Sequence, residues 1–589
     1  MTKLAELKVK VIYYYITMCG ILCLLNDRHC ETTDLDKAIQ EGKKRGPEQT
    51  QIDTIGECTL VFHRLAINGL DAGSMQPIEL EGVTMICNGE IFNYIELYYM
   101  LGASPTTNSD CEVILHLYKR FGIERTLELL DGEFAFVILD RSKEHSILHY
   151  ARDPFGVRPL YMCYESEGNT MVGLASELKV LNHISNQQMT ISQVDQGTYG
   201  TCMKESDTWY TASKTRYFRI PALSLYSKMQ IQPNVYFNQI VDTLKSAVKK
   251  RVETSKRSVA CLLSGGLDSS LIAALAARYY DNLNTYSIGM EGSEDLRNAR
   301  IVAHHIGSIH TEIILTEDEF FNAIPEVIKT IESFDTTTVR ASVGNYLVAK
   351  YIRENSDDKV ILNGDGSDEV TGGYIYMLNA PSDLDFDTEC RRLLSDIHYF
   401  DVLRSDRSVS SNGLEGRTPF LDKTFVSTYM QIPSHLRNPR SEYNLKSRYW
   451  NMYAQNMYNT HGDADIRDTI LSRPEKLLLR AAFQSRMPDL LPMSVLWRGK
   501  EAFSDGVSGT GKSWFEIIKN RLDETAIPFS VPNSYNDHMV SDTKEKMYYR
   551  SIFCHHYKSH DKSIPYFWMP KFVDATDASA RTLKHYTAR

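Results

Sequence analysis

The 589-residue chain has no excess of positive charge, no regular spacing of cysteines and no apolar run as long as a membrane span. Its 65 Lys and Arg against 75 Asp and Glu give a net charge of −10. This balance argues against a nucleic-acid clamp, whose basic surface must neutralise phosphates. The 11 cysteines are an odd number and form no framework, which favours free thiols in a reducing compartment. We therefore expect a cytoplasmic protein that binds neither nucleic acid nor membrane.

An uncharged run covers residues 11–25 and follows three lysines. A signal peptide would explain it, but its centre is aromatic and β-branched, and no small-residue cleavage site follows. The run is also shorter than the roughly 20 residues that cross a bilayer as a helix. A buried β-strand is therefore the prediction for this run.

Length and composition indicate a globular protein of several domains. Hydrophobic residues make up 42% and charged residues 24%, and at about 100–200 residues per domain the chain holds two or more. The first region alternates short β-like runs with turns and has a helical pattern at 111–122 that ends in Gly122. It predicts an α+β domain. The expected strands are 59–67, 83–93, 133–140, 146–153 and 171–177.

The pattern changes beyond a loosely patterned stretch at 205–235. Strands at 258–263, 284–290 and 359–364 alternate with helices at 269–280 and 298–307, which predicts a parallel sheet covered on both faces. After about residue 390 the pattern is mainly helical. The expected division is an extension at 1–18, a first domain at 19–210, a linker at 211–235 and a second domain at 236–589.

The sharpest local motif, SGGLDSS (264–270), lies between an apolar strand and a helix. Its two glycines permit a tight turn in which amide groups and the helix N-terminus face an anion. The serine hydroxyls can donate to phosphate oxygens, and Asp268 can hold Mg²⁺ against them. A capped Gly-Gly turn would explain any one of these residues, but not all of them in one strand-to-helix turn. The motif therefore predicts a phosphate site.

A second glycine-rich stretch, GVSGTGKS (506–513), matches the P-loop pattern G-x-x-x-x-G-K-[ST]. A P-loop follows a buried strand, whereas this stretch follows the polar sequence WRGKEAFSD. A helix does come after it, but no later apolar run ends in an aspartate. We interpret the match as a chance one in a loop.

An acidic turn, NGDGSDE (363–369), stands at the carboxyl end of the strand predicted at 359–364. In open α/β sheets, ligands bind outside the carboxyl ends of the strands. Three carboxylates beside a phosphate loop suit Mg²⁺ and a reacting carboxylate or amine. Taken alone, a solvated Asp/Gly turn explains this segment about as well.

Cys19 follows Met18 inside the uncharged run. A lone cysteine is most often a small buried hydrophobe. If translation starts at Met18 and this residue is removed, however, Cys19 becomes the first residue. Its α-amine, with a pKa of roughly 8, can then act as the base for its own thiol.

Four other residues would complete an amidohydrolase site around this nucleophile. Arg64 and Asp110 would hold the α-carboxylate and the α-amine of an amino acid. Asn88 and the N–H of Gly89 would form an oxyanion hole.

From Met18 onward the chain resembles the glutamine-hydrolysing asparagine synthetases, class II glutamine amidotransferases with a C-terminal ATP-pyrophosphatase domain. RDPFGVRPL (152–160), CLLSGGLDSS (261–270) and PFLD (419–422) include motifs of the wider group, whereas TTVRASVG (337–344) and KEAFSDG (500–506) look particular to asparagine synthetases. So many segments in order are very hard to obtain by chance. The other matches are MCGI (18–21), FHRLAI (62–67), NGEIFN (88–93), EVILHLY (112–118), LDGEFAFVILD (130–140), GDGSDE (364–369), FDVLRSDR (400–407), EKLLLR (475–480) and DASARTL (577–583).

The resemblance implies an αββα glutaminase domain with an N-terminal nucleophile, then a parallel-sheet ATP-pyrophosphatase domain with a mainly helical C-terminal part. Cys19 would attack the glutamine amide, and ammonia would leave through an internal tunnel. In the second domain, ATP and Mg²⁺ would convert aspartate to β-aspartyl-AMP and pyrophosphate. Ammonia would then displace AMP and give asparagine. The family precedent for assembly is a homodimer.

The resemblance also assigns residues to the two sites. Asp268 and Asp368 would bind Mg²⁺, Asp365 would be catalytic, and Lys476 would neutralise charge on the leaving pyrophosphate. The glutamine contacts would be Arg64, Leu65, Ala66, Ile67, Asn68, Asn88, Gly89, Glu90 and Asp110. The ATP contacts would be Leu263, Ser264, Gly265, Gly266, Asp268, Ser269, Ile288, Asn363 and Gly364.

Several departures from the family pattern bear on activity. Asp365 stands where the family has a Glu, and a shift near 1 Å can cost about a hundredfold in rate. Because the charge is kept, we expect a slower synthetase and not an inactive one. Asn363 replaces a Ser, Lys44 replaces the His of HRGPD, and Gly416 replaces a larger residue. Any residue left before Cys19 would turn its amine into an amide with no useful basicity.

Three alternatives stay open at this point. The same two-domain plan would serve another acceptor carboxylate, as in β-lactam-synthetase-like relatives, although TTVRASVG beside GDGSDE argues against it. The extension before Cys19 would, if retained, leave an ammonia-dependent synthetase with a blocked glutaminase. The third is a non-catalytic regulator that binds an amino acid or a nucleotide, but binding alone requires neither a nucleophile nor Lys476.

Overall fold

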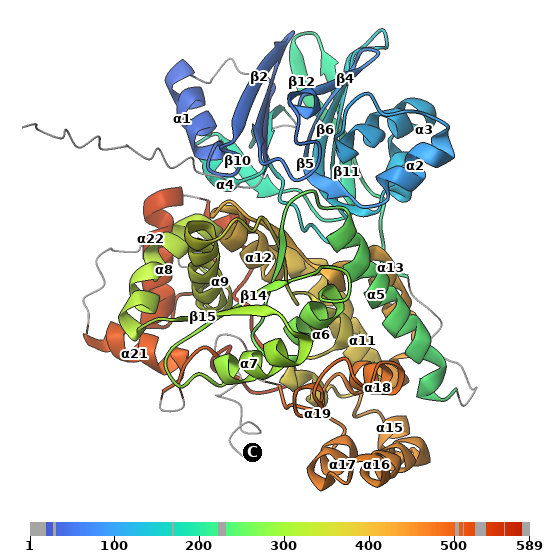
Figure 1. The fold of residues 1–589 in the computed structure, drawn as a ribbon. Coiled ribbons are helices and arrows are strands. Elements are labelled where there is room, and N and C mark those ends of the chain that lie inside the picture. Colours follow the sequence, from blue (N-terminus) through green and yellow to red (C-terminus); the bar gives the residue numbers. More distant parts are fainter. Residues whose placement is uncertain are drawn as a thin grey trace, which may run out of the picture.

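The computed structural model describes residues 19–26, 31–167, 170–221, 231–500, 506–509, 512–524, 538–558 and 560–579. The expected extension at 1–18, with Met18, lies outside these ranges, as do part of the expected linker and most of the KEAFSDG segment. Figure 1 shows two domains stacked on one another, with the N-terminal domain above the C-terminal one.

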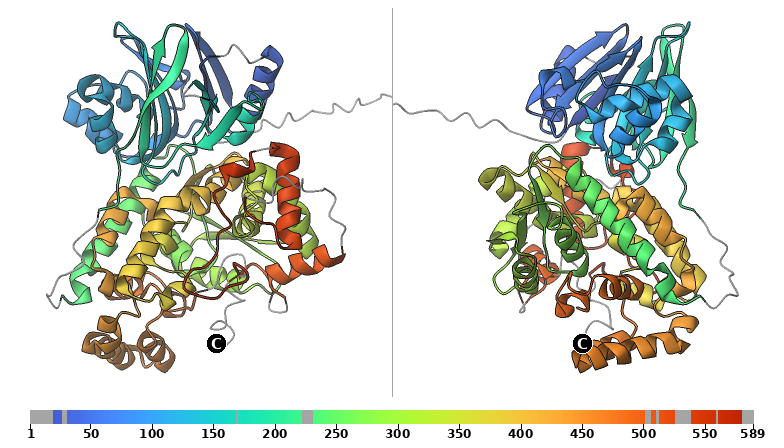
Figure 2. Two further views of the ribbon diagram at one scale, coloured as in Figure 1. Left: turned by 180° about the vertical axis from the view of Figure 1, so that it is seen from behind. Right: turned by 45° about the vertical axis from the view of Figure 1, so that its right-hand side comes forward.

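The N-terminal domain consists of two six-stranded antiparallel sheets with helices on their outer faces. The sheet orders are β10-β8-β9-β1-β3-β2 and β12-β11-β7-β6-β5-β4. Helices α1 (Thr32–Gly42) and α4 (Leu178–Asn182) cover the first sheet, and α2 (Tyr94–Leu101) and α3 (Val113–Leu129) cover the second (Figures 1 and 2). This confirms the αββα prediction. The strands are β1 (Gly20–Leu24), β2 (Gln49–Ile55), β3 (Cys58–Arg64), β4 (Ile78–Leu80), β5 (Val83–Ile91), β6 (Gly132–Asp140), β7 (Ile147–Arg152), β8 (Tyr161–Glu165), β9 (Met171–Ala175), β10 (Met189–Gln193), β11 (Thr198–Glu205) and β12 (Thr208–Arg216).

Alternation along β1 explains how the layers are held together. Ile21 and Cys23 pack in the core between the two sheets, whereas Leu22 and Leu24 pack against the helices outside. A strand buried on both faces reads as an uninterrupted apolar run. The buried strand predicted at 11–25 is therefore found at its described end, and residues 11–18 of that prediction lie outside the described residues.

The C-terminal domain contains a five-stranded parallel sheet in the order β15-β14-β13-β16-β17. Val259 and Cys261 of its central strand pack into the core formed with α5 (Phe237–Glu253) and α6 (Leu267–Ala276). Ala260 packs into the opposite core, formed with α8 (Glu317–Ile331) and α9 (Thr336–Asn355). The prediction of a parallel sheet covered on both faces is thus confirmed. The strands are β13 (Val259–Leu262), β14 (Asn284–Gly289), β15 (Ile309–Ile314), β16 (Val360–Leu362) and β17 (Glu415–Arg417).

The rest of this domain is mainly helical, as predicted, and α15–α17 project from its lower end in Figure 1. Among the described residues beyond 390, β17 is a strand, and it forms one edge of the parallel sheet. The remaining helices are α7 (Glu294–Ile306), α10 (Ser367–Thr371), α11 (Asp383–Asp396), α12 (Asp401–Ser410), α13 (Lys423–Met430), α14 (Ser434–Arg437), α15 (Glu442–Lys446), α16 (Arg448–His461), α17 (Ala464–Leu471), α18 (Leu477–Arg486), α19 (Met493–Leu496), α21 (Trp514–Glu524) and α22 (Lys544–Tyr557).

Two observations concern boundaries and loops. β12 continues to Arg216, so the first domain extends past the boundary expected at residue 210. In the P-loop-like stretch, Ser513 accepts a hydrogen bond from the Glu516 N–H at 3.2 Å and donates to its carboxylate at 2.9 Å. This serine therefore caps the start of α21. Such a contact fits the interpretation of GVSGTGKS as a chance match, although residues 510 and 511 lie outside the described ranges.

Candidate active sites

Cys19 directly precedes β1, and its sulfur lies against the turn that follows β3. The Leu65 N–H donates to Sγ at 3.3 Å, and the thiol donates to the Leu65 carbonyl oxygen at 3.2 Å. The thiol is thus held on the segment that carries the predicted glutamine contacts. Burial raises the pKa of the Cys19 thiol, although the Leu65 backbone opposes the shift. A base must therefore take its proton before it can act as a nucleophile.

Asn88 and Gly89 lie on β5, in the sheet that faces Cys19 across the domain core. Asn88 is 1% exposed, and neither the nitrogen nor the oxygen of its amide has a hydrogen-bond partner among the described residues. A buried amide without partners costs about 1–3 kcal/mol, so its retention is typical of a site that meets a ligand. Gly89 is required for space, because a Cβ there would lie 2.3 Å from the carbonyl oxygen of Glu133.

Two buried carboxylates, Glu90 and Asp110, lie beside these groups. Asp110 accepts a hydrogen bond from the Ile91 N–H at 2.7 Å, and burial raises its pKa to about 6. Burial and the nearby Asp110 also raise the pKa of Glu90 well above its usual range. Asn68 donates to Glu90, and Arg417 of the C-terminal domain lies 3.4 Å from the same carboxylate. A cation from the C-terminal domain therefore pairs with one of these two buried carboxylates.

The loop after β3 carries the remaining predicted glutamine contacts. The Arg64 guanidinium donates to the carbonyl oxygen of Asp71 at 2.8 Å and to that of Gly69. Leu65, Ala66 and Ile67 are buried between this point and Asn68. The structure thus brings the predicted glutamine-binding residues into one neighbourhood, built from the end of β3, β5 and the 3₁₀ helix at Asp110–Glu112.

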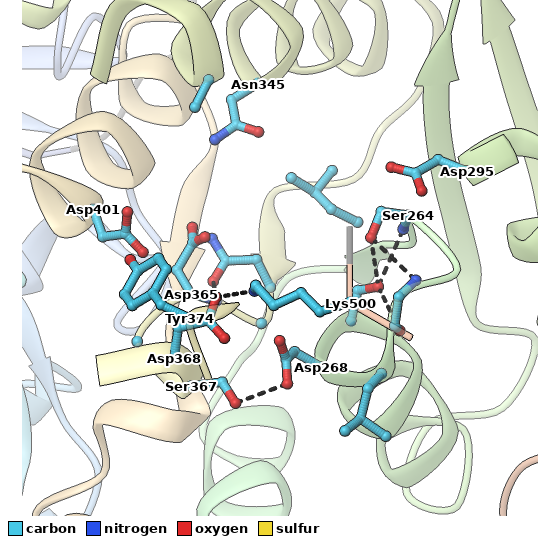
Figure 3. A pocket seen from close by; sticks show the side chains of 18 of the residues that line it. Ser264, Asp268, Asp295, Asn345, Asp365, Ser367, Asp368, Tyr374, Asp401 and Lys500 are labelled. Atoms are coloured by element: carbon cyan, nitrogen blue, oxygen red, sulfur yellow. Dashed lines mark hydrogen bonds and ion pairs between the residues drawn. The ribbon is translucent and has the colours of Figure 1, made fainter. Parts of the chain in front are cut away.

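The second candidate site is a cavity of about 250 Å³ at the carboxyl ends of β13, β14 and β16 (Figure 3). Gly265 does not line it. This glycine has a φ of 72°, and a Cβ on it would lie 2.4 Å from the Ala299 nitrogen, so it shapes the turn. The predicted ATP contacts that do line the cavity are Leu263, Ser264, Gly266, Asp268, Ser269, Ile288, Asn363 and Gly364.

Lys476 joins the two predicted magnesium ligands. Its Nζ lies 2.6 Å from a carboxylate oxygen of Asp268 and 2.6 Å from one of Asp368, and it donates to Ser367 at 3.1 Å. Lys500 pairs with the other oxygen of Asp368 (Figure 3). Burial opposes ionisation of Asp368, but the two lysines outweigh it and lower the pKa of this carboxylate. The centre of the cavity therefore holds acidic and basic side chains in ion pairs.

Asp365 lines the same cavity, and one of its carboxylate oxygens lies 3.1 Å from the Arg404 guanidinium. Burial raises the pKa of Asp365, and Arg404 opposes the shift. Beside it, the Asn363 amide donates to the Ser405 hydroxyl at 2.6 Å. The turn that carries Asp365 is thus attached to α12 at two points.

Sequence reasoning missed many of the charged or polar residues that line this cavity, among them Thr337, Tyr374, Asp401, Arg404 and Lys500. Of these five, all but Tyr374 lie within segments quoted for the family resemblance, so the signal was present. Arg340 of TTVRASVG instead pairs with Glu545 at 2.6 Å and Asp577 at 2.7 Å, which ties the C-terminal segment to α9.

Three further observations cover the described part of the chain. Within it, no three His, Cys, Asp or Glu side chains gather where they could hold a metal ion. None of its helices combines the length and the apolar character needed to cross a membrane. Each of its cysteines is a free thiol.

Comparison with known proteins accounts for both halves of the chain. The glutamine amidotransferase domain family matches residues 18–237, and the asparagine synthase family matches residues 239–386 and 378–573. An asparagine synthetase [glutamine-hydrolyzing] of Gallus gallus is 38% identical over 595 residues, covering 97% of this chain and 99% of the relative. Its counterpart in Homo sapiens is 37% identical over 604 residues, with the same coverage.

Proposed function

The chain belongs to the glutamine-hydrolysing asparagine synthetases, and we propose that its two candidate sites carry the two halves of that activity. It is a ligase that uses ATP to make asparagine from aspartate, with glutamine as the nitrogen donor. The observation that carries the assignment of residues is the meeting of Asp268, Asp368 and Lys476 beside the phosphate loop. These three charged groups lie where the phosphate loop and the acidic turn meet, which is where the phosphates of ATP would bind.

In the N-terminal domain, the Cys19 thiolate attacks the carboxamide carbon of glutamine, the C–N bond breaks, and ammonia leaves with the proton taken from the thiol. Water then hydrolyses the thioester and gives glutamate. The Asn88 amide nitrogen and the Gly89 N–H donate hydrogen bonds to the oxygen that becomes negative. The absence of a partner for the buried Asn88 amide among the described residues supports this role. Arg64 and Asp110 bind the α-carboxylate and the α-amine of glutamine. The proton of the thiol passes to the α-amine of Cys19, which requires Cys19 to be the first residue of the active protein.

In the C-terminal domain, the donor set fits Mg²⁺ bound with a nucleotide. Magnesium is usually held by one or two carboxylates together with phosphate oxygens, and Asp268 and Asp368 supply two carboxylates beside the phosphate loop. The ion would neutralise phosphate charge. Lys476 and Lys500 hold further positive charge where pyrophosphate leaves.

We propose that the reaction proceeds through β-aspartyl-AMP. The side-chain carboxylate of aspartate attacks the α-phosphorus of ATP, the bond to the bridging oxygen breaks, and pyrophosphate leaves. Ammonia then attacks the activated carbonyl carbon, loses a proton and displaces AMP. Asp365 lies in the same cavity and is the group placed to accept that proton, because burial raises its pKa.

The test is to measure asparagine and pyrophosphate formed from aspartate, Mg-ATP and either glutamine or ammonium. The chain as written is compared with a chain that starts at Met18, and each is compared with its Cys19→Ala variant. We expect both nitrogen donors to work from the Met18 start, and ammonium alone to work in Cys19→Ala. Absence of asparagine with ammonium in every protein would contradict the assignment of the second site.

A cytoplasmic location and a homodimer are also proposed, and both rest on the family resemblance. The free thiols of the described cysteines support a reducing compartment. Light scattering at the concentrations of the assay tests the dimer, because a dimer has twice the mass of the 67.3 kDa chain.

A further inference from the structure

Helix α12 (Asp401–Ser410) lies in the part of the C-terminal domain next to the N-terminal domain (Figure 1). Arg404 and Ser405 follow Asp401 by three and four positions, so these three residues share one side of the helix. Asp406 and Ser410 are four positions apart and share another side. The contacts below show that the two sides serve different sites.

Asp406 and Ser410 reach into the N-terminal domain and hold Arg45, which is 1% exposed. The guanidinium of Arg45 donates to both carboxylate oxygens of Asp406, at 2.8 and 3.2 Å, and to the Ser410 hydroxyl at 3.1 Å. Glu177 is a further acid partner of Arg45, at 3.1 Å. Its Nε then donates to the carbonyl oxygen of Cys19 at 3.1 Å. One arginine thus connects α12 to the backbone of the proposed nucleophile.

The other side of α12 holds the synthetase turn that contains Asp365. Arg404 pairs with Asp365 at 3.1 Å and with Asp401 at 2.9 Å. Ser405 accepts a hydrogen bond from the Asn363 amide at 2.6 Å. Helix α12 is therefore bonded to the acidic turn of one site and, one residue further along, to the arginine that holds Cys19 in the other.

We propose that Asp406 is a positioning residue for glutamine hydrolysis, which fixes Arg45 against the Cys19 carbonyl and so makes the position of the nucleophile depend on the synthetase turn at 363–365. The proposal rests on the function proposed above, in which Cys19 is the nucleophile. Asp406 also pairs with Arg407 at 2.9 Å and lies 3.6 Å from Arg158. Within the described part of the chain, no hydrogen bond or ion pair joins it to the predicted glutamine-binding residues, so its effect on Cys19 acts through Arg45.

The physical reason is the geometry of the arginine. A guanidinium held by two parallel bonds to one carboxylate has a fixed plane, and this plane directs Nε at the Cys19 carbonyl. An asparagine at 406 would keep the size but lose the charge and one acceptor. A displacement near 1 Å at a nucleophile can cost about a hundredfold in rate. A ligand that binds Arg404 or Asp365 replaces a contact that holds α12. The contacts of α12 then differ between the free and the ligand-bound protein, as coupling between two sites requires.

The experiment compares Asp406→Asn with Asp131→Asn in the form of the chain that hydrolyses glutamine. Asp131 also pairs across the domain boundary, but with Lys250 of α5, whereas Asp406 pairs with Arg45. Glutaminase kcat and KM are measured with and without Mg-ATP and aspartate, and asparagine formation is measured with ammonium. Cys19→Ala is included in each assay.

For Asp406→Asn we expect glutaminase kcat to fall at least about tenfold while KM for glutamine changes less than about twofold. Ammonium-dependent synthesis stays within about threefold, and the response of the glutaminase to Mg-ATP and aspartate is lost. Asp406→Glu restores part of kcat, and Asp131→Asn behaves as the parent. If Asp406→Asn does not fold, Ser410→Ala removes one acceptor of Arg45 and gives a smaller fall in kcat of the same kind.

Unchanged glutaminase kcat in Asp406→Asn, or an equal loss of kcat and ammonium-dependent synthesis, would overturn the positioning role. Retention of glutaminase activity in Cys19→Ala would instead refute the proposed nucleophile. The two failures are therefore distinguishable in one set of assays.

Discussion

The two candidate sites differ in how their polar groups are satisfied. In the synthetase cavity, Asp268 and Asp368 share Lys476, and Lys500 adds a second cation. At the glutaminase site, the Asn88 amide has no partner among the described residues. The difference matches the chemistry of the substrates. Phosphate groups carry several negative charges, which charged side chains must balance. A neutral carboxamide instead needs hydrogen-bond donors directed at one oxygen.

The sites also stand on different parts of their folds. The synthetase cavity lies where parallel strands end, so the phosphate loop and the acidic turn meet because β13 and β16 are neighbours. The glutaminase groups come from an antiparallel sheet and from loops. Arg417 pairs with Glu90 from across the domain boundary, and Arg45, which contacts the Cys19 backbone, is held by Asp406 of the other domain. The first site is therefore assembled within one domain, and the second depends on contacts between domains.

The largest effect is expected from Lys476→Met. The variant leaves Asp268 and Asp368 without the cation they share, so charge on the leaving pyrophosphate is no longer balanced. We expect asparagine formation to fall by about 10³-fold with either nitrogen donor, while glutamine hydrolysis continues. Pyrophosphate release measures the first effect and glutamate release the second. Lys446→Met, at a lysine whose side chain is 76% exposed, is the control. Ammonium-dependent synthesis within tenfold of the parent would remove Lys476 from the reaction.

Asn88→Ala is expected to give the next largest effect, at the other site. Glutaminase kcat falls by about 10²-fold because one oxyanion donor is lost, and ammonium-dependent synthesis is unchanged. Since Asn88 makes no hydrogen bond among the described residues, the free energy of unfolding should not decrease.

The matched control is Asn93→Ala. The Asn93 side chain donates to the Leu129 carbonyl at 3.0 Å and accepts from the Asp131 N–H at 3.0 Å. This variant should lose about 1–3 kcal/mol of stability in urea unfolding and keep its glutaminase kcat. The opposite pattern in the two variants would mean that Asn88 is structural.

Much of what distinguishes the two sites could be predicted from the sequence, because the motifs that indicate it are local. The SGGLDSS turn stands in one continuous segment with the strand before it (258–263) and the helix after it. The acidic turn likewise comes directly at the end of a predicted strand (359–364). No local pattern in the sequence indicates which residues contact each other across the domain boundary. Arg45 sits in a turn after α1, and Asp406 sits on a helix 361 residues away. Only the packing of the domains brings them together. Strands such as β2 and β12 were not predicted from the sequence, because they are edge strands that expose a mixture of polar and apolar residues.

A moderate effect is expected from Asp365→Glu. The longer side chain restores the reach that the family pattern has, and Arg404, 3.1 Å from Asp365, can still pair with it. We expect kcat for asparagine formation to rise by about tenfold with both donors, and glutaminase kcat to stay constant. Asp401→Glu, which lengthens the other acid held by Arg404, should not raise the rate. A slower Asp365→Glu enzyme would show that the cavity has adapted to the shorter acid.

The smallest effect concerns pH and separates the glutaminase from the synthetase without a mutation. Burial raises the pKa of Asp110 to about 6, from an ordinary value of about 3.9. A carboxylate must be ionised to bind the protonated α-amine of glutamine, so binding weakens as the pH falls through this folded-state value and is constant above pH 7. With a pKa of about 6, KM for glutamine should rise about fourfold between pH 7 and 5.5. In Asp110→Asn, KM should be high at both values and lose this dependence. The KM for aspartate in the ammonium-dependent reaction has no part in this titration, because Asp110 lies in the other domain. A glutamine KM that stays constant down to pH 5.5 in the parent enzyme would mean that the α-amine is bound by another group.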